Sequence, residues 1–191
     1  MAFEKMAGGP LSDFLRAERA EALDSSLLAR IVAEVANGVA HLHEHSIIHR
    51  DIKPANVLLD LALRARVSDL GMSTRFGRAE HTAERGTYRQ MAPEIVLRRP
   101  YDHKVDVYSF GVLMWETLHP GDEPFAGLMP LQAAFAVAMQ QTRPPMSLRK
   151  EHEGYSDLMQ ACWDAEPTSR PEMAVVAQAT ARLAVSLGVA L

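Results

Sequence analysis

The chain has 191 residues, of which 48% are hydrophobic and 23% are charged, and its formal net charge is −4 at pH 7. This composition is typical of a folded globular protein, and the length fits one domain or part of a larger one. No basic block suggests binding to nucleic acid, and the longest apolar run, Phe110 to Trp115, is too short to span a bilayer. Because Cys162 is the only cysteine, no disulfide framework can form within the chain, and we expect a reducing, cytoplasmic location.

The N-terminal part of the sequence predicts a short extended segment followed by two helices. Residues Met1–Met6 alternate weakly, and the glycines and proline at 8–10 indicate a linker. The first helix should open at Leu11, directly after a proline that a first turn tolerates. Asp24 or Ser25 can cap a second, longer helix. Its apolar residues recur every three or four positions: Leu27, Leu28, Ile31, Val32, Val35, Val39 and Leu42.

The second helix ends in a group of histidines, at positions 41, 43 and 45. Histidines four residues apart on a helix could bind zinc, but no third ligand follows at a spacing typical of metal sites. Positive charge at the C-terminus of a helix is the simpler interpretation.

A dense group of polar residues follows, between two apolar runs. From Ile47 to Leu59 the sequence reads Ile-Ile-His-Arg-Asp-Ile-Lys-Pro-Ala-Asn-Val-Leu-Leu, which suits a rigid loop between a helix and a strand. Residues 57–60 and 64–67 then predict two short strands joined by a turn. The stretch from Met72 to Met91 has neither a helical nor a strand period, and a loop of this length inside a compact domain is usually functional.

The C-terminal half is predicted to be helical. Helices are expected at residues 92–97, 105–118, 131–139 and 155–163. The second of these is apolar almost all round, so it should lie buried in the core. A last helix should open at a capping box, Ser169-Arg170-Pro171-Glu172, and run to about Leu187. We therefore expect one mainly α unit with a short β-hairpin.

Several motifs together resemble those of protein kinases. The residues from His49 to Asn56 resemble the catalytic loop H-R-D-L-x-x-x-N, with isoleucine in place of leucine, and residues 69–71 resemble D-F-G with leucine in place of phenylalanine. Residues 92–94 match A-P-E as they stand. The whole chain, residues 1–191, resembles the hinge and the large C-terminal lobe of a protein kinase, in particular of the tyrosine-kinase-like group of serine/threonine kinases.

The resemblance implies a serine/threonine protein kinase that transfers the γ-phosphate of ATP to protein hydroxyls with the help of Mg²⁺. Asp51 would be the catalytic base, and Lys53 would place a positive charge near the transferring phosphate. Asn56 and Asp69 would provide oxygen ligands for magnesium. The serine/threonine preference is implied by Lys53, because tyrosine kinases usually carry another residue there.

The resemblance also implies residues that bind adenine and residues that support the site. Adenine would lie against the hinge segment with Glu4 and Met6, and above Leu58. The supporting residues would be His49, Arg50, Thr87, Glu94, Asp106 and Arg170. Among these residues, Glu94 and Arg170 should form a buried ion pair, and Asp106 should hold the backbone of the catalytic loop.

The polar stretch after residue 71 contains candidate phosphorylation sites. Ser73, Thr74 and Thr82 offer hydroxyl groups among several arginines. A phosphate on Thr82 could pair with Arg50 and order this segment, while the alternative is an exposed threonine in a solvated loop.

Two departures from the family pattern stand out. Gln90 occupies a position where the family commonly has an aromatic residue, beside the expected substrate pocket. The chain also starts at the hinge, so a small lobe or regulatory segment is an expected partner, in addition to the protein substrate. We expect the chain alone to bind ATP weakly. The alternative function is a catalytically silent kinase-like module that docks protein partners.

Overall fold

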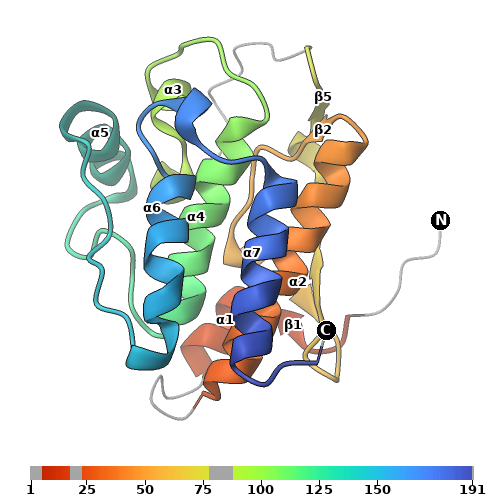
Figure 1. Ribbon diagram of the computed structural model, residues 1–191. Coiled ribbons are helices and arrows are strands. Elements are labelled where there is room, and N and C mark those ends of the chain that lie inside the picture. The colour runs from red at the N-terminus through yellow and green to blue at the C-terminus, as the bar shows by residue number, and fades with distance from the viewer. Residues whose placement is uncertain (1–5, 18–22, 78–87, 191) are drawn as a thin grey trace.

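The computed structural model describes residues 6–17, 23–77 and 88–190. Helices α2 (Ser25–Glu44), α4 (Lys104–Leu118), α6 (Ser156–Cys162) and α7 (Met173–Ser186) stand side by side at the centre of the molecule (Figure 1). Helix α2 packs against α4 and α7, and α4 also packs against α6. The other helices, α1 (Leu11–Ala17), α3 (Pro93–Val96) and α5 (Pro130–Gln140), lie around them. The mainly helical architecture expected from the sequence is confirmed. None of the helices in the described residues is long and apolar enough to cross a membrane.

Helix α2 begins where its capping residue predicts. The Asp24 side chain accepts a hydrogen bond from the backbone N–H of Ser26 at 3.1 Å, which satisfies a donor that the first turn leaves unpaired. Val32 and Val39, on the apolar face of α2, are fully buried. The helix ends at Glu44, so His45 caps the helix rather than continuing it.

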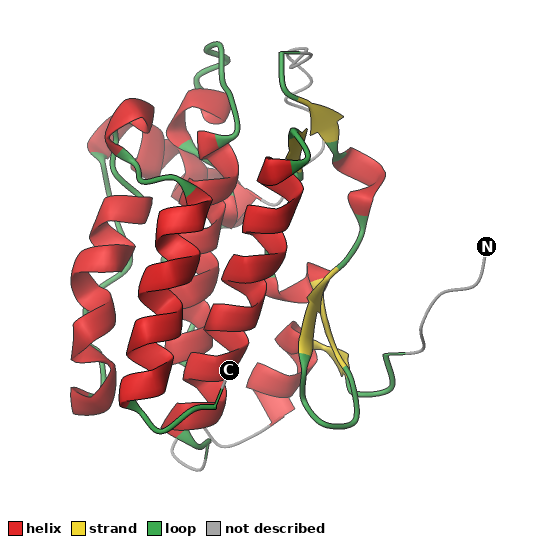
Figure 2. Cartoon of the chain, turned by 45° about the vertical axis from the view of Figure 1, so that its right-hand side comes forward, coloured by secondary structure: helices red, strands yellow, loops and turns green. Residues whose placement is uncertain are grey.

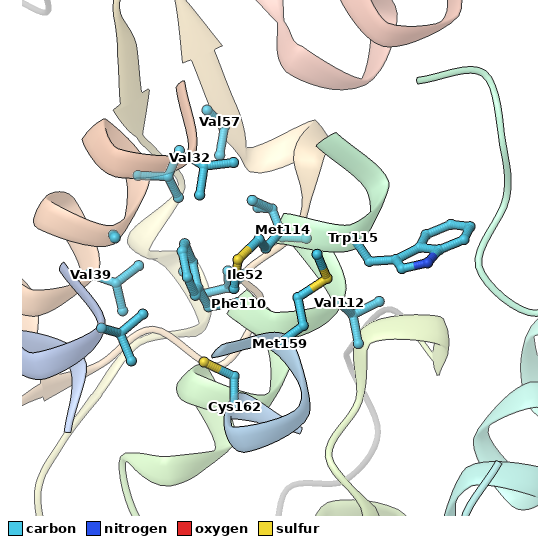
Figure 3. Packing of buried hydrophobic residues seen from close by; sticks show 14 of the residues in the cluster. Val32, Val39, Ile52, Val57, Phe110, Val112, Met114, Trp115, Met159 and Cys162 are labelled. Atoms are coloured by element: carbon cyan, nitrogen blue, oxygen red, sulfur yellow. The ribbon is translucent and has the colours of Figure 1, made fainter. Parts of the chain in front are cut away.

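Helix α4 is buried on nearly every side, as its sequence predicts. Figure 3 shows Phe110 and Met114 of this helix packed among the side chains of α2 and α6. Gly111 allows the close approach to α6, because a Cβ atom at this position would lie 2.9 Å from the Cβ of Cys162. Burial also raises the pKa of the Cys162 thiol to about 12, which keeps this cysteine protonated.

Two small antiparallel sheets lie beside the helices, and Figure 2 shows them on one side of the bundle. Strands β1 (Gly9–Pro10), β3 (Val57–Leu59) and β4 (Ala65–Val67) form one sheet in the order β1-β3-β4. Strands β2 (Ile47–Ile48) and β5 (Thr74–Arg75) form the other. The hairpin of β3 and β4 confirms the two strands predicted from the sequence.

Strands β1 and β5 correct the sequence prediction. Gly9–Pro10 was expected to be a linker, and β5 lies in a stretch that was expected to have no regular structure. Both strands contain only two residues, and each is defined by pairing with a distant segment rather than by local alternation. One-turn helices at Leu70–Met72 and Tyr88–Gln90 were also missed, because a single turn is too short to show a helical period in the sequence.

The expected capping box before the last helix is wrong. Ser169 ends a one-turn helix, Pro167–Ser169, and α7 begins at Met173 with Glu172 as its capping residue. Arg170 is extended, with φ −69° and ψ 138°, because a residue that precedes proline is disfavoured in the helical region. The helix therefore cannot run through Arg170.

Candidate active site

The loop from His49 to Asn56 is fastened to the core by Asp106, a fully buried residue of α4. One carboxylate oxygen of Asp106 accepts a hydrogen bond from the backbone N–H of His49 at 2.7 Å, and the other accepts from that of Arg50 at 2.8 Å. Arg50 has a positive φ of 67°, a conformation that costs free energy for a residue other than glycine. The Asp106 carboxylate stabilises this conformation of Arg50 and so fixes the position of the backbone that leads into Asp51.

His49 is fully buried, and its neighbours determine its tautomer. Its Nε2 lies 2.9 Å from the carbonyl oxygen of Ser68, which can only accept. Its Nδ1 lies 3.2 Å from the backbone N–H of Asp51, which can only donate. The ring is therefore neutral, with its hydrogen on Nε2, and it joins the 49–56 loop to the segment that follows β4.

Asp51, Lys53 and Asn56 lie together at the end of this loop. The Asn56 amide donates from Nδ2 to the backbone oxygen and to Oδ2 of Asp51, both at 2.8 Å. The Lys53 ammonium lies 2.7 Å from the same Oδ2. The carboxylate of Asp51 is thus held in one orientation by an amide and a positive charge.

The oxygens of Asn56 and Asp69 suit a hard cation such as magnesium. Because Nδ2 of Asn56 makes both hydrogen bonds to Asp51, its Oδ1 is the atom that remains for a cation. Asp69 is in the left-handed region, with φ 62°, and its Oδ1 accepts from the backbone N–H of Gly71 at 3.2 Å. An amide oxygen together with a carboxylate oxygen is a donor set that magnesium takes in proteins, so these residues fit the ion.

The residues expected to bind adenine are only partly described. Met6 and Leu58 are both half-buried. In β3, Val57 and Leu59 are buried whereas Leu58 points to the opposite face of the strand, away from the core. Leu70 is 50% exposed. Glu4, Thr82 and Thr87 lie outside the described residues.

The segment after Asp69 lies against the 49–56 loop. Strand β5 pairs with β2, and the Arg50 guanidinium donates to the backbone oxygen of Met72 at 2.5 Å and to the hydroxyl of Tyr101 at 3.3 Å. Ser73 and Thr74 are half-buried, and the Ser73 hydroxyl donates to the backbone oxygen of Leu70 at 2.8 Å. These two candidate phosphorylation sites are therefore part of the folded structure.

Glu94 and Arg170 form the buried bidentate pair expected from the resemblance. The Arg170 guanidinium donates to the two carboxylate oxygens of Glu94 at 2.6 and 2.9 Å. It also donates to the backbone oxygens of Lys104 and Asp164, at 3.0 and 2.9 Å. The pair connects α3, the start of α4 and the segment before α7.

His43 has a role that the sequence analysis missed. Its Nε2 lies 3.0 Å from Oδ2 of Asp106, and its ring packs edge-on against those of Phe76 and His103. The sequence favoured a charge effect at the helix end and left zinc as the alternative. In the structure, His43 also contacts the carboxylate that holds the 49–56 loop. No cluster of three or more potential metal ligands from His, Cys, Asp and Glu occurs among the described residues.

Gln90 and Glu116 form a second pair that the sequence analysis missed. The Gln90 amide donates from Nε2 to Oε1 of Glu116 at 2.6 Å. Both residues line a pocket of about 390 Å³, together with Lys53 and residues of α1 and of the segment after α4. Burial raises the pKa of Glu116 to about 7, although the Gln90 hydrogen bond and the charge of Arg89 act in the other direction. The position of Gln90 was noticed in the sequence, but no local signal identified Glu116.

Comparisons with known proteins find related sequences over nearly the whole chain. Residues 1–179 match a family model described as protein tyrosine and serine/threonine kinase. The chain is 37% identical over 186 residues to serine/threonine-protein kinase STY17 of Arabidopsis thaliana, a match that covers 97% of this chain and 32% of that protein. It is 38% identical over 170 residues to serine/threonine/tyrosine-protein kinase HT1 of the same plant, covering 88% of this chain and 43% of HT1. The chain thus spans less than half the length of these curated relatives.

Proposed function

Because the chain belongs to the family of protein tyrosine and serine/threonine kinases, we propose that it carries the catalytic residues of an ATP-dependent serine/threonine protein kinase. The observation that carries the proposal is the Asp51 carboxylate, held between the Asn56 amide and the Lys53 ammonium on a loop fastened to the core. The serine/threonine names of relatives such as STY17 support this substrate class. We propose the whole of residues 1–191 as part of one kinase domain.

Asp51 would accept the proton of the substrate hydroxyl as this hydroxyl attacks the γ-phosphate of ATP. Asn56 would keep the Asp51 carboxylate oriented toward the substrate by its hydrogen bond to Oδ2, the oxygen that Lys53 also contacts. Lys53 would move its positive charge toward the phosphoryl group as negative charge develops there. His49 and Asp106 would act indirectly, by fixing the loop that carries these side chains.

Nucleotide and metal would bind on the side of the loop that faces the β3–β4 hairpin. Asn56 and Asp69 would hold magnesium, which when bound would neutralise negative charge on the phosphates. The half-buried Met6 and Leu58 would contact adenine, with Glu4 in the same hinge segment. Thr87 would order the substrate side of the loop. A cytoplasmic location fits a chain whose only cysteine is a buried thiol.

The proposal is tested by replacing Asp51 with asparagine, which keeps the size of the side chain and removes the base. We expect Asp51→Asn to lower the rate of phosphate transfer from ATP to casein by about a hundredfold or more. The affinity for ATP should change little, because the role of Asp51 concerns the hydroxyl. Both quantities are measured on the chain itself and on the chain joined to the preceding segment of STY17.

The matched control is Asp157→Asn, which changes an exposed aspartate at the start of α6. This variant should transfer phosphate at the normal rate. Transfer by Asp51→Asn at the rate of the unmodified protein would exclude Asp51 as the base. Transfer by none of the proteins, together with retained binding of protein partners, would favour the alternative of a docking module.

A further inference from the structure

We propose that Phe76, His103 and Glu172 form a proton-sensitive latch, which holds the end of the 70–77 segment against the helices. This segment follows Asp69, leads away from the candidate active site and includes β5. The inference goes beyond the proposed function, because it concerns the opening of this segment and not the transfer of phosphate.

Phe76 connects the segment to three other parts of the chain. Its backbone N–H donates to the carbonyl oxygen of Ser46 at 2.9 Å, directly after the pairing of β2 with β5. Its ring stacks on that of His103, with the centroids 4.8 Å apart and the planes at 16°, and packs edge-on against that of His43 at 6.0 Å. Because the Phe76 side chain is 37% exposed, burial alone holds it weakly, and the ring contacts contribute to its position.

His103 is paired with Glu172, the capping residue of α7. Its Nε2 lies 2.8 Å from Oε2 of Glu172, and the other oxygen of Glu172 lies 2.9 Å from the Lys104 ammonium. Although burial raises the pKa of Glu172, the hydrogen bonds from Lys104 and His103 lower it further, so this pKa lies below its usual value. An anion beside Nε2 favours the protonated, positively charged form of a histidine. A positive charge also strengthens the contact with the face of an aromatic ring.

His43, the other histidine of this cluster, is not suited to carry the charge. Its Nε2 lies 3.0 Å from Oδ2 of Asp106, and its Nδ1 is buried with no hydrogen-bond partner in the described part of the chain. A second proton on this ring would therefore be buried without an acceptor. The charged residues next to the two rings are of types that ordinarily titrate far from neutral pH: Asp102, Lys104, Asp106 and Glu172. His103 is thus the residue of the cluster that we expect to respond near neutral pH.

The latch should be closed at low pH and weaker at high pH. An ordinary histidine loses its proton at about pH 6–7. Below this range, a charged His103 ring contacts Phe76 and Glu172. Above it, the neutral ring keeps its shape but lacks the charge that strengthens both contacts. The lowered pKa of Glu172 keeps its carboxylate ionised on both sides of this range.

The test measures hydrogen exchange of the Phe76 backbone amide by NMR at about pH 5.5 and about pH 8, below and above the range in which histidine titrates. Each rate is compared with that of the unfolded sequence at the same pH, so that only the protection by the structure is scored. We expect this protection to be about threefold higher at the lower pH, because a partly exposed ion pair contributes a modest factor to local stability.

Substitutions assign the effect to individual residues. His103→Gln removes the titrating ring and should give equal protection at the two pH values. His103→Arg keeps a positive charge at both and should give the higher protection at both. Phe76→Leu, which removes the stacked ring, should lose most of the pH effect. The matched control is His41→Gln, which changes an exposed histidine of α2 and should keep the threefold difference.

Two results would overturn the proposal: equal protection of the Phe76 amide at both pH values in the unmodified protein, or a pH effect retained in His103→Gln. Neither depends on phosphate transfer. Asp51→Asn should keep the pH effect on the Phe76 amide, so the latch and the catalytic proposal can fail separately.

Discussion

Asp106 shows how a single buried carboxylate can position a whole loop, here residues 49–56. Its oxygens accept hydrogen bonds from the backbone N–H groups of His49 and Arg50 and contact the ring of His43. A neutral amide cannot replace it, because the nitrogen of an asparagine would face one of these donors. The charge and both oxygens are needed to keep Arg50 at its positive φ.

We expect Asp106→Asn to lower the free energy of unfolding by about 2–4 kcal/mol, since at least one buried N–H loses its acceptor. Activity should fall as well, because the loop before Asp51 is released. Urea denaturation followed by circular dichroism measures the loss. Asp157→Asn, on the surface, should change stability by only a few tenths of a kcal/mol at most. Equal stability of the two variants would contradict the role given to Asp106.

At the scale of secondary-structure elements, the Glu94–Arg170 pair fastens together segments that are far apart in the sequence. Arg170 is 1% exposed and Glu94 is 5% exposed, so neither charge can turn to water if its partner is removed. Arg170 also lies over the ring of Tyr108, at 5.1 Å from its centroid. Burial raises the pKa of this tyrosine to about 12, so the ring stays neutral beside the ion pair.

Arg170→Ala should therefore destabilise the protein by about 3–5 kcal/mol, because it leaves the Glu94 carboxylate buried without its counter-charge. Thermal unfolding measures this as a strong decrease in the melting temperature. Arg99→Ala removes an exposed arginine just after α3 and serves as the control, with little expected effect. Similar melting temperatures for the two variants would mean that the pair contributes little to stability.

At the scale of the whole molecule, one hydrophobic core connects the helices with the small sheets. Residues of α2, α4, α6 and α7 belong to the same cluster of buried side chains, together with Val57 and Leu59 of β3. The helices that position the 49–56 loop therefore also form the hydrophobic core. Such an arrangement favours cooperative unfolding.

We expect unfolding in urea to occur as a single transition with the same midpoint for two probes. Far-ultraviolet circular dichroism follows the helices, while fluorescence follows the buried residues Trp115 and Trp163, at α4 and just after α6. A partly folded unit would unfold separately and would be seen by one probe before the other. Two separate midpoints would contradict our proposal that the chain is one domain.

Elements with local sequence signals could be predicted before the structure was known. The 3.6-residue period predicted α2, the unbroken apolar run predicted the burial of α4, and the motif from His49 to Asn56 predicted a polar site between a helix and a strand. These features depend on residues that are neighbours along the chain, so one stretch of sequence contains the whole signal. The Glu94–Arg170 pair was anticipated only through the resemblance to kinases.

Features that depend on distant residues could be seen only in the folded chain. The contact of His43 with Asp106, the pair of Gln90 with Glu116 and the pairing of β1 with β3 each join segments that no local pattern connects. The start of α7 likewise depends on a distant contact. Arg170 is extended and donates a hydrogen bond to Glu94, at a position where the sequence predicted a capping box. Burial and hydrogen bonding across the core gave these side chains their roles, and both exist only once the chain has folded.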